Sequence, residues 1–122
     1  MRAPTWVVEQ VENAADFEPF APEGVETGQI YWVRRHDAGG DLAAAVWRAE
    51  PCTFDYFFDS DEVCYVLDGE ASVALLDERT TVALRPGDIA YFKSGTRAIW
   101  TVTTPFRKFV VGPVDRAASG PT

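Results

Sequence analysis

Residues 62–76 read EVCYVLDGEASVALL, and this stretch decides the fold class. Residues 63–67 form a nearly continuous apolar run, which is typical of a short strand that is covered on both faces. Asp68 and Gly69 follow, and this dipeptide suits a tight turn because both residues tolerate a positive φ. Residues 71–76 then supply a second strand-forming run. The stretch therefore predicts a β-hairpin with its turn at Asp68-Gly69.

The same pattern repeats along most of the chain. Short runs of β-branched and aromatic residues are separated by turns rich in Gly, Pro and Asp, and no run has the 3.6-residue period of a long helix. The predicted strands are 30–35, 42–48, 52–58, 63–67, 71–76, 80–84, 89–92, 98–103 and 106–111. Many short strands with frequent turns predict an all-β sandwich or barrel that follows an irregular N-terminal segment.

The length of the chain predicts the number of domains, and its net charge limits the partners that it can bind. The 122 residues, 47% of them hydrophobic, are enough for one domain with its own core. A net charge of −8 argues against nucleic acid and anionic membranes as partners. No apolar stretch approaches the roughly 20 residues that span a bilayer. We expect a single domain over 1–122, with an N-terminal extension over 1–29, core motifs over 47–111 and a loose tail over 112–122.

The cysteines and the histidine limit the chemistry. Cys52 and Cys64 are too few for a disulfide scaffold or a four-thiolate metal site. Residues 1–10 lack the apolar block of a secretory signal, so we expect a cytoplasmic protein with free thiols. His36 is the single histidine, which excludes any mechanism that needs two imidazoles.

Two motifs in residues 47–110 resemble those of the cupins. Glu62 and Gly69 have the E-x6-G spacing of the first cupin motif, and Arg85-Pro86-Gly87-Asp88 before a hydrophobic strand resembles the second. With Trp100 and Arg107-Lys108, the second motif is similar to that of small cupins grouped with ureidoglycine aminohydrolase. The resemblance implies a double-stranded β-helix, or jelly-roll barrel.

The chain departs from the metal-binding cupins at their ligands. Metal-dependent cupins place His-x-His shortly before the glutamate and another histidine in the second motif. Here Asp55 and Phe57, or with a one-residue shift Tyr56 and Phe58, occupy the first two positions, and Ala98 occupies the last. Only Glu62 remains, and a lone carboxylate among aromatic rings does not hold a transition metal tightly. We therefore expect no metal and no other cofactor.

Strand alternation predicts what faces the barrel interior. If Glu62 points inward, then Cys64 and Val66 share its face, and Lys108 shares a face with Phe106. A carboxylate at Glu62 pairs with Lys93 or Lys108, as a structural ion pair or as a general acid or base. We place Glu62, Lys108 and Tyr56 as candidate catalytic residues. The candidate ligand-binding residues are Asp55, Phe58, Tyr91, Lys93, Arg97 and Trp100.

Three functions remain open at this point. The first is a metal-free cupin that binds a small anionic or amide-bearing molecule. The second is an enzyme of the lyase, isomerase or amidohydrolase type that uses acid/base chemistry at Glu62. The third is a non-catalytic structural or interaction cupin whose pocket is filled by aromatic rings. The resemblance also implies a homodimer, for which residues 1–35 are the candidate interface.

Overall fold

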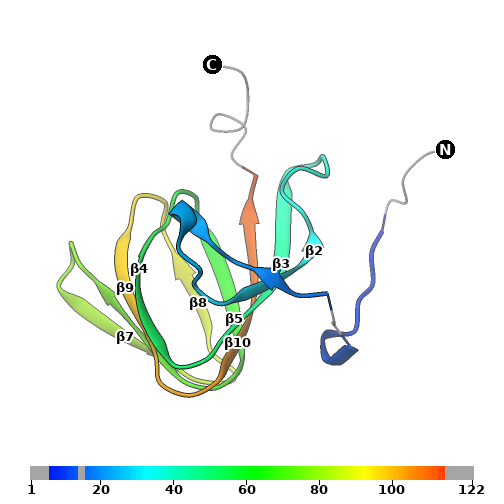
Figure 1. Cartoon of the computed structure of the whole chain (residues 1–122). Coiled ribbons are helices and arrows are strands. Elements are labelled where there is room, and N and C mark those ends of the chain that lie inside the picture. The colour runs from blue at the N-terminus through cyan, green and yellow to red at the C-terminus, as the bar shows by residue number, and fades with distance from the viewer. Residues whose placement is uncertain (1–5, 14–15, 115–122) are drawn as a thin grey trace.

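The computed structural model describes residues 6–13 and 16–114, and this part of the chain folds into two facing antiparallel sheets (Figure 1). The strands are β1 (Glu18–Pro19), β2 (Gln29–Arg34), β3 (Leu42–Ala49), β4 (Cys52–Phe57), β5 (Glu62–Asp68), β6 (Ala71–Leu75), β7 (Thr80–Leu84), β8 (Ile89–Phe92), β9 (Arg97–Val102) and β10 (Phe106–Pro113). Two short 3-10 helices, η1 (Val11–Asn13) and η2 (Pro22–Gly24), precede β2. In the described residues, no helix is long and apolar enough to cross a membrane.

The strand order makes this a jelly-roll barrel. One sheet has the order β1-β2-β3-β10-β5-β8, and the other has the order β4-β9-β6-β7. Neighbouring strands in each sheet are mostly distant in sequence, such as β3 with β10 and β4 with β9. All nine strands predicted from the sequence are present with bounds that differ by at most two residues, so the all-β prediction is confirmed.

The hairpin predicted at Asp68-Gly69 is wrong, because the two strands belong to different sheets. β5 pairs with β10 and β8, whereas β6 pairs with β7 and β9. Gly69 has φ +80°, and a Cβ at this position would collide with the carbonyl of Pro105. Next to it, the backbone N–H of Glu70 donates to Thr104 Oγ1 at 2.8 Å. Gly69 is therefore a corner at which the chain changes sheet while packed against the β9–β10 connection.

The core lies between the sheets and is rich in aromatic rings. Trp47 from β3, Trp100 from β9 and Phe106 from β10 meet with ring centroids 6.0–6.2 Å apart in edge-on geometry. Phe54 stacks parallel to Trp100, with an interplanar angle of 2°. Because these rings come from both sheets, they set the spacing between them, and Trp47, Phe54 and Trp100 also line the cavity described below.

The N-terminal extension is irregular, as expected. Residues 9–12 contact the outer face of the six-stranded sheet, whereas residues 20–27 contribute to the lining of the cavity between the sheets. Tyr31 donates to Glu9 at 2.8 Å, and the guanidinium of Arg107 pairs with Glu12 at 3.0 Å. At the other end β10 continues through Pro113, two residues past the predicted strand end. The predicted tail beyond residue 114 lies outside the described residues.

Candidate functional site

A cavity of about 870 Å³ lies between the two sheets, and we call it the barrel cavity. Most of its lining residues are apolar or aromatic, and among its polar residues are the members of one buried ion pair. Its lining includes Trp32, Trp47, Tyr56, Trp100, Glu62 and Lys108. Ligand sites for small organic molecules have this composition, with apolar walls and a few placed polar groups.

Glu62 and Lys108 form the polar centre of the barrel cavity. Lys108 faces Val66 across the β10–β5 ladder, and its Nζ donates to Glu62 Oε2 at 2.8 Å. The side chains of Lys108 and Glu62 are only 8% and 12% exposed. The sequence left Lys93 and Lys108 open as partners of Glu62, and the structure places Lys108 there. A pair so well shielded from water is screened very little, so its charges act strongly on any group beside it.

Two indole rings complete the surroundings of the Lys108 ammonium. Its Nζ lies 4.2 Å from the centroid of the Trp100 ring and 5.3 Å from that of Trp47. The negative faces of these rings attract a cation, an effect worth about 2 kcal/mol or more when the cation is desolvated. Glu62, Trp100 and Trp47 therefore hold the ammonium in one position.

Tyr56 brings a hydroxyl group to the same cavity from β4. Burial raises the pKa of this phenol, and the negative charges of Glu62 and Asp59 raise it further. Within the described residues the hydroxyl has no hydrogen-bond partner, so it is available to a ligand as a neutral donor. Asp55 also lines the cavity, although its side chain is exposed at the edge strand β4.

Four of the predicted ligand-binding residues lie outside the barrel cavity. Phe58 is 1% exposed and stacks on Phe92 with ring centroids 4.7 Å apart, so it belongs to the core. Tyr91 is 58% exposed, because the residues of β8 that face inward are Ala90 and Phe92.

Lys93 and Arg97 are the other two predicted ligand-binding residues that lie outside the barrel cavity. Lys93 follows β8 and is exposed, in line with Tyr91 two residues before it. Arg97 begins β9 with its side chain outward and pairs with Asp77 at 2.6 Å, where both side chains are more than 60% exposed. The structure therefore brings together Glu62, Lys108, Tyr56, Trp100 and Asp55, and it separates Phe58, Tyr91, Lys93 and Arg97 from them.

The sequence analysis missed most of the other lining residues, and Trp32, His36 and Trp47 are three of them. Trp47 alternates along β3 with Ala45 and Ala49, so strand periodicity alone could have placed it inward. His36 follows β2 in a turn, and its ring centroid lies 5.4 Å from that of Trp32. No local pattern brings this turn to the cavity, because its position depends on how β2 pairs with β3.

The donor groups in the cavity do not fit a metal ion. In the described residues there is no group of three or more His, Cys, Asp or Glu side chains that could hold one. Cys64 is buried nearby, and burial raises the pKa of its thiol, which disfavours the thiolate that a metal needs. Of the carboxylates that line the cavity, Glu62 already has the Lys108 ammonium as its partner.

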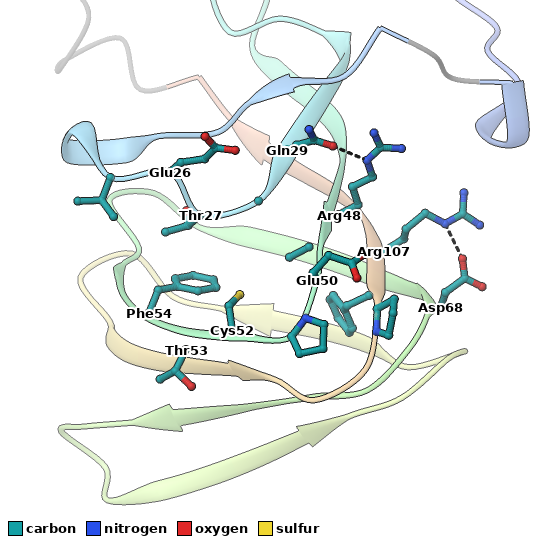
Figure 2. Close-up of a pocket in the computed structure, with 16 residues that line it drawn as sticks. Glu26, Thr27, Gln29, Arg48, Glu50, Cys52, Thr53, Phe54, Asp68 and Arg107 are labelled. Carbon is teal, nitrogen blue, oxygen red and sulfur yellow. Dashed lines mark hydrogen bonds and ion pairs between the residues drawn. The ribbon is translucent and has the colours of Figure 1, made fainter.

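A second cavity of about 790 Å³ lies between the residues before β2 and the β3–β4 and β9–β10 connections (Figure 2). It adjoins the barrel cavity, with which it shares Val25, Thr27, Thr53 and Phe54. Figure 2 shows Arg48 and Arg107 pointing away from Cys52 and pairing with Gln29 and Asp68. These charged groups are thus directed toward solvent.

Comparison with known proteins agrees with this architecture. Residues 37–109, more than half of the chain, match the EutQ-like cupin domain. The EutQ protein of Clostridium difficile is similar at 21% identity and TM-score 0.62, over 73% of this chain and 71% of that one. A DUF861 family protein from Thermotoga maritima is 32% identical with TM-score 0.51, over 53% of this chain and 73% of its own. Ectoine synthase from P. lautus shares the fold at TM-score 0.71 and 13% identity, over 89% and 78% of the two chains. No curated protein sequence matches.

Proposed function

The chain belongs to the EutQ-like cupin family, and from this premise we propose that it binds a small organic molecule in the barrel cavity without a metal. The observation that carries the proposal is the Glu62–Lys108 pair, nearly excluded from water in the wall of a cavity of about 870 Å³. A cavity of this size is large enough for a metabolite and argues against a barrel filled by its own rings.

The ligand that suits these groups carries a carboxylate or an amide. The Lys108 ammonium has donors beyond the one given to Glu62, and these can hold a carbonyl or carboxylate oxygen. The Tyr56 hydroxyl can donate to a second oxygen, and the half-buried indole of Trp32 offers an apolar surface in the cavity wall. The resemblance to the ureidoglycine aminohydrolase group is compatible with such a ligand.

Acid/base catalysis is the extension of this proposal. Glu62 would take a proton from the bound molecule, while the Lys108 ammonium and the Tyr56 hydroxyl stabilise the negative charge that develops on its oxygen. Lyase and isomerase reactions include such a step, and in an amidohydrolase Glu62 would instead take the proton of the attacking water while the same donors stabilise the oxyanion. A related fold carries an enzyme in ectoine synthase from P. lautus, which makes catalysis compatible with the barrel.

Native mass spectrometry and a Glu62→Gln variant test the proposal. We expect the purified protein to retain a small molecule, or to show a rise in melting temperature with a carboxylate or amide from a metabolite set. Glu62→Gln should abolish turnover. Because it leaves the Lys108 ammonium without its carboxylate, it should also lower stability, so turnover is compared under conditions in which circular dichroism shows the variant to be folded. The matched control is Arg97→Gln, which removes an exposed charge far from the barrel cavity. A protein that neither carries nor responds to any small molecule would favour the non-catalytic interaction cupin.

We also propose that the protein works as a cytoplasmic homodimer, apart from nucleic acid and membranes. The two cysteines in the described residues are free, which suits a reducing compartment, and the net charge of −8 disfavours polyanions. Residues 1–35 are the proposed interface, and Trp6 and Val8 in this segment are 72% and 79% exposed. Light scattering at micromolar concentration should give twice the mass of 13.5 kDa, and the monomer mass would contradict the dimer.

A further inference from the structure

The surroundings of Lys108 Nζ have the features of a binding site for a cation. A carboxylate oxygen of Glu62 lies 2.8 Å away, and the ring centroids of Trp100 and Trp47 lie 4.2 and 5.3 Å away. Trp100 is 1% exposed and Trp47 5% exposed, so these rings present their faces to the ammonium from inside the core. One oxygen anion and two π faces around a single point suit a monovalent organic cation.

The same point does not suit a divalent metal. Zinc, manganese and iron sites are built from several nitrogen, sulfur or oxygen ligands, whereas this one offers a single carboxylate. Indole faces cannot replace the lost water ligands of a dication. A dication entering beside Glu62 would also meet the Lys108 ammonium, whose repulsion is strong where water is excluded.

We infer that the ammonium of Lys108 is a built-in cation that fills a cation site formed by Glu62, Trp100 and Trp47. By the motif resemblance Glu62 matches the glutamate of metal-binding cupins, and here it holds a positive charge that is covalently part of the chain. The site is therefore a recognition site for an alkylammonium group, and the lysine side chain is its permanent occupant. This inference goes beyond the proposed function, since it holds whether or not a small molecule binds in the remaining cavity.

Removal of the lysine side chain tests the inference directly. Lys108→Ala deletes a three-carbon chain that ends in ammonium, which is n-propylammonium in size and charge. We expect n-propylammonium chloride to raise the melting temperature of this variant by about 5 °C at ten times its dissociation constant. Sodium chloride matches the ionic strength and n-propanol matches the shape, but neither supplies the alkylammonium cation. Both should raise the melting temperature much less.

Two further variants separate specific binding from general effects. Glu62→Gln combined with Lys108→Ala keeps the space but removes the anion, so its response to n-propylammonium should fall to that given by n-propanol. The wild-type protein and Arg97→Ala, in which the lysine still fills the site, should respond no more to n-propylammonium than to sodium chloride. Equal stabilisation of all variants, or equal effects of n-propylammonium and n-propanol on Lys108→Ala, would overturn the inference.

A refolding assay covers the case in which Lys108→Ala does not fold alone. The urea-unfolded variant is diluted into n-propylammonium or n-propanol, and the folded fraction is read from tryptophan fluorescence. A higher folded yield with the cation supports the inference, and equal yields contradict it. One equivalent of Mn, Fe, Ni or Zn bound by the wild-type barrel in elemental analysis would also contradict it. Because none of these measurements uses a ligand of the cavity, failure of the proposed function would leave their outcome unchanged.

Discussion

The barrel cavity and the second cavity are similar in volume, about 870 and 790 Å³, and each has an ion pair in its wall. They differ in how far water reaches those charges. Lys108 and Glu62 are 8% and 12% exposed, whereas Arg107 is 24% exposed and its partners Asp68 and Glu12 are 55% and 79% exposed. Exposed ion pairs are weakened by solvent and salt. Burial of the pair, rather than volume or charge content, therefore distinguishes the candidate site.

The largest effect expected from this difference is that of Lys108→Met. The substitution keeps most of the side-chain volume but leaves the Glu62 carboxylate buried without its partner. Loss of one member of a buried ion pair typically lowers the free energy of unfolding by about 3–5 kcal/mol. Urea denaturation at neutral pH measures this loss.

The double variant Glu62→Gln with Lys108→Met shows whether the loss comes from the unpaired charge. It removes both charges, and we expect it to recover most of the stability that Lys108→Met loses. If the double variant were as unstable as the single one, packing around Lys108 rather than electrostatics would explain the effect, and the contrast between the two cavities would fail.

The strands were predictable because their signals are local. Gly, Pro and Asp mark the turns, and alternation along β5, β9 and β10 correctly turned Cys64, Trp100 and Lys108 inward. The hairpin at Asp68-Gly69 failed for a non-local reason. The sequence of a turn does not specify which sheet the next strand joins, and Gly69 is needed for its close approach to Pro105.

The site was less predictable than the strands, because it depends on contacts between segments that are distant in sequence. Tyr91 and Lys93 were assigned to the pocket as candidate ligand-binding residues, but Ala90 and Phe92 occupy the inner face of β8. His36 and Trp32 reach the barrel cavity only because β2 pairs with β3 and β3 with β10. Such pairings between distant segments have no signature in the local sequence.

The next largest effect concerns Tyr56 in alkaline solution. Because burial, Glu62 and Asp59 raise the pKa of its phenol, the unfolded chain loses this proton at lower pH than the folded one. The contribution of Tyr56 to stability is thus complete below a pH of about 10 and falls as the pH rises further. We expect Tyr56→Phe to reduce this alkaline fall in the free energy of unfolding, measured by urea denaturation at several pH values.

A control is needed because Cys64 acts in the same direction. Burial raises the pKa of its thiol, so it also lowers stability as the pH rises, beginning near the ordinary pKa of a cysteine. The comparison is therefore best made in a Cys64→Ala background. Tyr65→Phe, which removes a hydroxyl from a side chain that is 44% exposed, serves as the matched variant. An alkaline fall that is the same in Tyr56→Phe and Tyr65→Phe would contradict the assigned role of burial.

A smaller effect is expected at the second cavity. Arg107→Gln removes the pairs with Asp68 and Glu12, in which the acidic partners are more than half exposed. Because exposed pairs contribute little, we expect a loss of at most about 1 kcal/mol, and less at high salt. Urea denaturation at low and high sodium chloride measures both. A loss as large as that of Lys108→Met would remove the distinction between the two cavities.

The smallest effect is expected for Arg97→Gln. The sequence analysis named Arg97 as a candidate ligand-binding residue, but its guanidinium pairs with Asp77 on the outside of the barrel, and the two side chains are 61% and 63% exposed. This hydrogen-bonded arginine lowers the pKa of the Asp77 carboxyl, an effect that salt screens at such exposure. Melting temperature and ligand-induced shift should therefore equal those of the wild type within error. A lost ligand response in Arg97→Gln would mean that the ligand binds outside the barrel cavity, since no part of Arg97 lines it.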